Sequence, residues 1–290
     1  MIRSLARARA IRRNEAGRAL MDAGDLTGAA AAYAGAVRLD PALATAWFNL
    51  GLVHKWRREW ADAVRCNLAA LGESGEPGDP AWWNLGIAAT ALRDWETARR
   101  AWRGFGVDVP DGDGEIEMGL GLVPIRIAPH TAPEVVWCER LDPARGRIEN
   151  VPFPESGRRW HDVVLHDGEP TGERLLRGRP VPVFDELELW ARAPWPTTVV
   201  EVVADEAAVD DLRETAEGAG WAAQDWTASV RMLCDTCSLG APGHEHDPAE
   251  DAGRRDRRLG IAAPPADVPA LLAAWAARDD GVTYGDPVTG

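Results

Sequence analysis

Glycine recurs at a nearly constant interval in the first third of this 290-residue chain, and this interval constrains the fold more than any other feature. Gly17, Gly51 and Gly86 are 34 and 35 residues apart. Each glycine is followed twelve residues later by an alanine: Ala29, Ala63 and Ala98. Small residues at two fixed positions let paired helices cross closely, so the interval predicts stacked helical pairs.

The register of these residues resembles the tetratricopeptide repeat, a helix–turn–helix unit of 34 residues. The resemblance covers about residues 10–110 as three repeats, and Asn49-Leu50-Gly51 and Asn84-Leu85-Gly86 carry it best. The first repeat departs at Arg13 and Ala16, where large apolar residues are expected, and the second departs at Asn67. An unrelated helical bundle with chance spacing is the alternative.

The resemblance implies a concave groove, lined by the first helix of each repeat, that takes an extended or helical peptide. By register the partner-binding residues are Asn14, Arg18, Phe48, Asn49, Leu52, Lys55, Trp56, Trp83, Asn84 and Ile87. A carboxamide can both donate to and accept from a peptide backbone, and exposed aromatic residues are enriched among interface hot spots. We therefore expect a protein or peptide partner. Alternatively, another part of the same chain fills the groove. The family's carboxylate clamp for C-terminal peptides is not matched.

Charge and periodicity divide the chain near residue 112. Residues 1–110 hold 15 basic and 12 acidic residues, whereas the remainder holds 17 basic and 34 acidic residues. We predict an α+β multidomain protein with a helical repeat domain at 1–112, a small β-barrel-like domain at 113–195 and a ferredoxin-like α+β domain at 196–290.

The middle region changes to short apolar runs separated by turns, which is typical of a small barrel or twisted sheet. Gly and Pro place turns at Asp142–Gly146 and Gly168–Gly172. The predicted strands are Val123–Ile127, Val135–Leu141, Arg147–Val151, Asp162–His166, Arg174–Leu176 and Pro182–Trp190.

The last region predicts the element order β-α-β-β-α-β, which is the ferredoxin-like split arrangement. Its strands are expected at Thr198–Ala204, Ala228–Cys234, Arg258–Ala262 and Gly281–Tyr284, and its helices at Asp205–Gly218 and Pro264–Arg278. This fold hosts many functions and by itself indicates none.

A Cys/His loop is inserted after the second of these strands. Cys234 and Cys237 form a C-x-x-C turn, and His244 and His246 follow within thirteen residues. Two thiolates and two imidazoles make a tetrahedral set suited to Zn²⁺, so we expect a structural zinc ion. The alternatives are a loop without a ligand and a redox pair. The Gly/Pro-rich residues after Cys237 oppose the helix that a thioredoxin-like pair needs.

Composition narrows the remaining function classes. A net charge of −14 argues against a nucleic-acid partner, and no apolar run is long enough to span a membrane. The Arg-rich start lacks the apolar segment of a secretion signal, and four cysteines do not form a disulfide framework, so we expect a cytoplasmic protein.

The main prediction is a protein-interaction scaffold. The alternatives are a metal-dependent hydrolase using the Cys/His loop, with Asp235 or Glu245 as base, and a ferredoxin-like RNA-associated protein.

Overall fold

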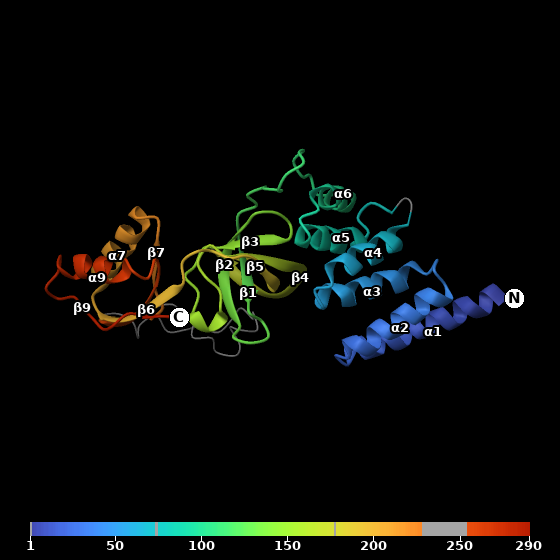
Figure 1. Cartoon of the computed structure of the whole chain (residues 1–290), viewed down its shortest axis with the longest axis horizontal. Coiled ribbons are helices and arrows are strands. Elements are labelled where there is room, and N and C mark those ends of the chain that lie inside the picture. Colours follow the sequence, from blue (N-terminus) through green and yellow to red (C-terminus); the bar gives the residue numbers. More distant parts are fainter. Residues whose placement is uncertain (1, 73–74, 177, 228–253) are drawn as a thin grey trace. The chain divides into compact units, whose positions relative to one another are not determined.

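The computed structural model describes residues 2–72, 75–176, 178–227 and 254–290 (Figure 1). The chain forms two compact units. The first comprises residues 1–118 together with 142–144, and the second comprises residues 119–141 and 145–290. A helical region is thus followed by a strand-rich region, as expected for an α+β chain. Among the described residues, no helix is long and apolar enough to cross a membrane.

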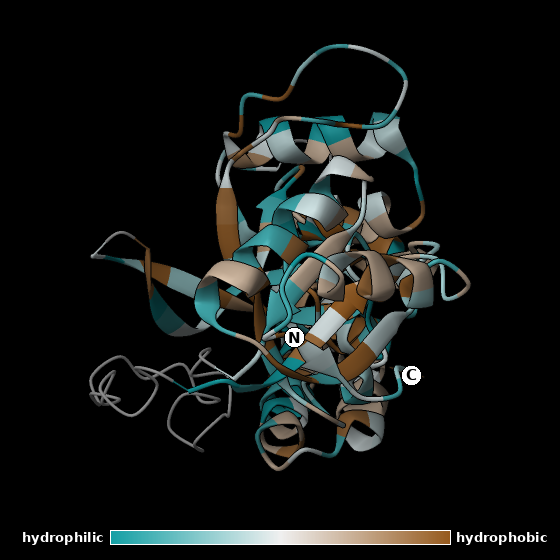
Figure 2. Cartoon of the chain, turned by 90° about the vertical axis from the view of Figure 1, so that its left-hand side faces the viewer, coloured by the Kyte–Doolittle hydropathy of each residue, from teal (hydrophilic) through white to brown (hydrophobic). Residues whose placement is uncertain are grey.

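The helices of the first unit follow the predicted repeat. They are α1 (Ile2–Asp22), α2 (Leu26–Leu39), α3 (Ala44–Trp56), α4 (Trp60–Leu71), α5 (Pro80–Ala91) and α6 (Trp95–Phe105). The side chains of Asp25, Asp79 and Asp94 cap α2, α5 and α6 by accepting from backbone N–H groups of the first turn. In Figure 2 the helical ribbons carry both hydrophilic and hydrophobic residues.

The repeat glycines lie where paired helices cross. A Cβ atom on Gly17 would lie 2.7 Å from the Tyr33 ring, and one on Gly86 would lie 2.6 Å from the Trp102 ring. Both distances are too short for a side chain, so the role that the spacing predicted for these glycines is confirmed. The unexpected Arg13 is accommodated in the same way, because a Cβ atom on Gly35 would collide with its guanidinium group.

The core of the first unit runs from one repeat into the next. One buried cluster joins Tyr33 of the first repeat to Leu50 and Cys66 of the second. Another joins Leu71 of the second repeat to Leu85 of the third. Stacking of this kind is what stabilises a solenoid, because each helical pair buries its apolar face only against its neighbours.

The second unit begins with a closed five-stranded barrel in the order β1-β2-β3-β4-β5. Its strands are β1 (Leu122–Ile127), β2 (Glu134–Arg140), β3 (Arg145–Ile148), β4 (Val163–Leu176) and β5 (Arg179–Ala191). Neighbouring strands are antiparallel except β1 and β5, which pair in parallel and close the barrel. Alternate residues such as Ile125, Val136 and Ile148 fill its interior.

The predicted turn at Gly168–Gly172 is wrong. These residues lie within β4, so the two short strands expected at Asp162–His166 and Arg174–Leu176 are one long strand. The pairing of β4 with β5 shifts register near His166, Pro170 and Gly172. Proline and glycine are tolerated in a strand at such irregularities, which is why they imitate a turn in the sequence.

A second sheet follows, with strand order β10-β6-β8-β7 and β9 also paired to β6. Its elements are β6 (Thr197–Val203), α7 (Glu206–Gly218), β7 (Ala222–Asp225), β8 (Asp256–Ala262), α9 (Val268–Ala276), β9 (Thr283–Tyr284) and β10 (Val288–Thr289). Both helices pack on it around Leu212, Leu272 and Trp275, and the Trp275 indole donates to the Ala208 carbonyl at 2.7 Å. The predicted strand at Ala228–Cys234 lies outside the described residues.

The barrel and the second sheet share a buried cluster inside the second unit. Trp226 packs with Val151 and Ala262, and its indole donates to the Val151 carbonyl at 3.1 Å. The Val151 N–H donates in turn to the Gln224 side chain at 2.9 Å. These contacts fix the segment after β3 against strand β7.

Candidate peptide-binding groove

The first helices of the three repeats, α1, α3 and α5, carry all ten predicted groove residues, which differ widely in exposure. Arg18 and Trp56 are exposed, and Asn14, Phe48, Leu52 and Trp83 are half-buried. The remaining four are buried: Asn49, Lys55, Asn84 and Ile87. Their assignment to partner binding stays a prediction.

The buried amides bond one repeat to the next. Asn49 Nδ2 donates to Asn14 Oδ1 at 3.0 Å, which joins α3 to α1. Lys55 Nζ donates to Asn84 Oδ1 at 3.0 Å, which joins α3 to α5. Asn84 Nδ2 also donates to the Pro80 carbonyl of its own helix at 3.4 Å. The polar groups predicted to receive a peptide backbone therefore hold the first helices together.

Trp83, the predicted groove aromatic of the third repeat, packs against other aromatic residues of the same repeat. Trp83 packs edge-on against Trp102, with ring centroids 5.1 Å apart, and against Phe105, with centroids 4.9 Å apart. Edge-to-face pairs at these distances are favourable. Trp83 thus contributes to the packing of α5 on α6.

An open hollow of about 280 Å³ lies between the first and second repeats. It lies between α1 and the start of α3 and is lined by Ile11, Asn14, Glu15, Arg18, Leu43 and Thr45. Two of these, Asn14 and Arg18, are predicted site residues. Glu15 lies beside them on α1, and the prediction missed the remaining three residues, Ile11, Leu43 and Thr45. Ile11 lies three residues before Asn14 and seven before Arg18, and this spacing places all three on one helix face. The spacing could therefore have identified Ile11 from the sequence.

The four predicted zinc ligands, Cys234, Cys237, His244 and His246, lie outside the described residues. The other two cysteines, Cys66 and Cys138, are buried and far apart in the chain. Burial raises the pKa of the Cys66 thiol to about 11, and burial likewise raises the pKa of Cys138. Neither is therefore suited to supply the thiolate that a metal ion requires.

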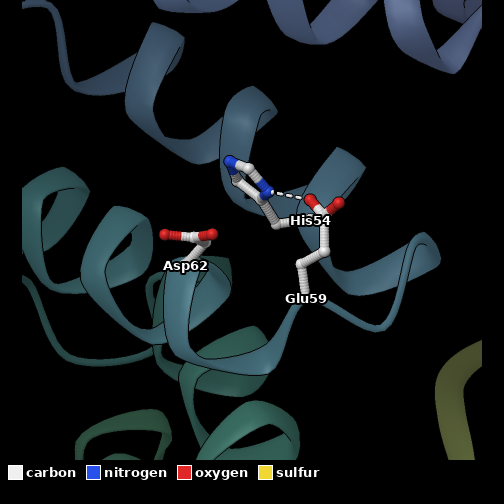
Figure 3. A group of neighbouring side chains, drawn as sticks. All are labelled: His54, Glu59 and Asp62. Atoms are coloured by element: carbon white, nitrogen blue, oxygen red, sulfur yellow. Dashed lines mark hydrogen bonds and ion pairs between the residues drawn. The ribbon is translucent and has the colours of Figure 1, made fainter.

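A cluster of possible metal ligands that the sequence did not indicate lies at the α3–α4 turn (Figure 3). One ligand atom each from His54, Glu59 and Asp62 lies within 4.8 Å of the others. His54 Nδ1 lies 2.6 Å from Glu59 Oε2, and that carboxylate also pairs with Arg57 at 3.0 Å. Asp62 pairs with Arg65 at 2.7 Å. Ion pairs within the turn account for these charges.

Comparisons with known proteins agree with the helical geometry. A family model described as TPR repeat matches residues 17–55, from the end of α1 to the end of α3. No curated protein sequence matches the chain.

Solved structures similar to the chain include tetratricopeptide-repeat proteins. The second TPR of Spaghetti (RPAP3), bound to the HSP90 peptide SRMEEVD, is 18% identical with a TM-score of 0.33 and covers 36% of this chain and 94% of its own. The first TPR of Spaghetti, bound to the same peptide, is 19% identical with a TM-score of 0.32 and covers 34% and 78%. YrrB, a TPR protein with an unusual peptide-binding site, is 28% identical with a TM-score of 0.30 and covers 32% and 50%.

The family match covers the crossing of Gly17 with Tyr33, and the same crossing recurs at Gly86 and Trp102. The helical region of this chain is a tetratricopeptide-repeat region.

Proposed function

We propose that the chain is a protein-interaction scaffold that binds a peptide segment of its partner at the first-repeat end of the groove. The observation that carries this proposal is the hollow of about 280 Å³ between α1 and α3. Ile11 and Leu43 offer an apolar contact there, and Asn14 and Arg18 offer hydrogen bonds beside it. Polar groups placed beside apolar side chains suit a peptide side chain and its backbone.

A peptide library displayed on phage and selected with the full chain tests this site. Ile11 is 40% exposed, so Ile11→Asp should fold while placing a charge in the lining of the hollow. Selected peptides, resynthesised, should lose at least about tenfold in affinity, which corresponds to about 1.4 kcal/mol. Leu39→Asp is the matched control, because Leu39 is 36% exposed on α2 and does not line the hollow. Equal binding to both variants would place the interaction elsewhere.

We further propose that Cys234, Cys237, His244 and His246 hold a structural zinc ion. The support is the chemistry of the sequence, which places two thiols and two imidazoles within thirteen residues. Metal analysis of the purified full chain should find about one zinc per chain. Cys234→Ser should remove it, whereas Cys66→Ala should retain it. Less than about 0.2 zinc per chain in the unmodified protein would end the proposal, and the hydrolase alternative with it.

We also infer a ferredoxin-like arrangement for the second sheet and a reducing, cytoplasmic compartment. Support for the arrangement comes from the strand order β10-β6-β8-β7, in which the first strand pairs with the third and the last. Support for the compartment comes from Cys66 and Cys138, which are single buried thiols.

A further inference from the structure

The second unit contains a cavity that neither the groove nor the Cys/His loop explains. Its volume is about 560 Å³, which is within the usual range for small-ligand pockets. The cavity is open to solvent and is lined by helix α7, by strand β7 with the residue before it, by the segment that follows β3 and by Arg257 of β8.

Two half-buried tryptophans line this cavity. Trp221 precedes β7 and packs against the core of the second sheet. Trp160 lies on the segment after β3, and its ring stacks on His161 with centroids 3.5 Å apart and planes inclined by 23°. Burial lowers the pKa of His161, which favours its neutral form at pH 7.

The helical wall consists of a stripe of charged residues together with Val209. Glu206, Asp210, Arg213 and Glu217 are spaced by four, three and four residues along α7, so they share one face. Asp210 pairs with Arg213 within this stripe. In the parts of the chain that the structure describes, no ion pair involves Glu206 or Glu217.

The remaining charges of the cavity are already matched. Asp225 on β7 pairs with Arg257, which also donates to the Ala204 carbonyl at 3.1 Å. Glu149 accepts from Arg147 at 2.8 Å. The lining as a whole has five carboxylates and two guanidinium groups. Its excess negative charge is thus concentrated at Glu206 and Glu217.

We propose that this cavity binds an organic cation, either a guanidinium or an alkylated ammonium group. A cation over an indole face is attracted by the ring, and nearby carboxylates add to this attraction. The cavity provides both elements together, with room for the carbon groups that such cations carry. An anion would be repelled by Glu206 and Glu217, and a neutral ligand would gain nothing from their charge. The occupant is therefore chosen by charge as well as by shape.

Titrations of the full chain with two cations and their uncharged analogues test the proposal and show which of the two groups, guanidinium or alkylated ammonium, the cavity binds. Choline is compared with 3,3-dimethylbutan-1-ol, and acetyl-arginine amide with acetyl-citrulline amide. Tryptophan indole N–H shifts in nuclear magnetic resonance spectra report binding. At least one cation should bind with a dissociation constant on the order of 1 mM, as expected for a small ligand. Its uncharged analogue should bind at least about tenfold more weakly.

Variants on α7 then locate the site. Glu206→Gln together with Glu217→Gln should weaken cation binding about tenfold, since both exposed carboxylates lose their charge. Arg213→Gln should strengthen it a few-fold, because Asp210 is released from its ion pair. Glu214→Gln is the matched control: Glu214 is exposed on the same helix but does not line the cavity.

Three results would overturn the proposal: no binding of either cation up to about 20 mM, equal binding of the uncharged analogues, or equal weakening by Glu214→Gln. Loss of peptide binding at the groove would leave it intact, because all variants used here lie in the second unit.

Discussion

The second and third repeats use one backbone geometry with different chemistry at its tightest point. In the third repeat Gly86 faces the indole of Trp102, which is fully buried. In the second repeat Gly51 faces the side-chain amide of Asn67, which is equally buried. A Cβ atom would lie 2.6 Å from the Trp102 ring but 3.0 Å from Asn67 Nδ2. The crossing thus depends on a small residue on one helix and tolerates either an aromatic or a polar residue on the other.

The largest expected effect is that of a large residue at the tightest crossing. Gly86→Leu would have to displace an indole that is fully enclosed, so it should destabilise the first unit by about 3 kcal/mol or more. Gly51→Leu should cost less, about 1–3 kcal/mol, because the facing amide is smaller than an indole. Hydrogen exchange of α5 and α6, and of α3 and α4, measures each change in the full chain. Wild-type protection in Gly86→Leu would contradict the assigned crossing.

The side-chain hydrogen bonds that link neighbouring repeats should also contribute unequally to stability, with the larger contribution again from the third repeat. Asn84→Ala removes an acceptor from the buried ammonium group of Lys55, so we expect a loss of about 2 kcal/mol. Asn49→Ala removes a bond between two neutral amides, and we expect a loss of about 1 kcal/mol. Denaturant unfolding followed by helical circular dichroism ranks the two variants. The reverse order would show that Asn84 is not the stronger link.

Alanine substitution of each glycine should change stability differently at the two crossings. Gly86→Ala places a Cβ atom against Trp102, and this overpacking of about 1–2 kcal/mol exceeds the gain of about 1 kcal/mol in helix propensity. Gly51→Ala meets the end of a polar side chain that can shift slightly, so the two terms should nearly cancel. The same unfolding measurement applies. Equal changes in the two variants would remove the distinction between the repeats.

The sequence predicts helical crossings well because they depend on single residues at fixed intervals, such as Gly17 with Tyr33. It predicts irregular strands poorly. Proline and glycine are typical of turns, so Pro170 and Gly172 indicate a turn in the sequence, and only their pairing with β5 identifies a strand. Strand β7 (Ala222–Asp225) was missed because it is short and has no alternating apolar pattern.

Exposure within the groove could not be predicted from the register either. The register places Asn49 and Asn84 on the first helices, but their partners Asn14 and Lys55 lie 35 and 29 residues away. Only the stacking of repeats brings these side chains together. The Trp160–Trp221 cavity was missed for a similar reason, because its walls come from segments about sixty residues apart in the sequence.

A last expected effect, opposite in sign to the others, concerns Asn67 itself. Its Nδ2 group donates to the Ala63 carbonyl at 2.8 Å, whereas its Oδ1 atom has no hydrogen-bond partner within the described residues. A buried acceptor without a partner costs free energy, and an apolar residue of similar shape avoids that cost. Asn67→Leu should therefore stabilise the second repeat by about 1 kcal/mol, because the Ala63 carbonyl keeps its helical bond. Asn67→Asp is the matched control and should destabilise the repeat, since it buries a charge beside Gly51. Denaturant midpoints of the two variants give the comparison. A loss of stability in Asn67→Leu would mean that the hydrogen bond from Asn67 Nδ2 to the Ala63 carbonyl contributes more than the unpaired Oδ1 atom costs.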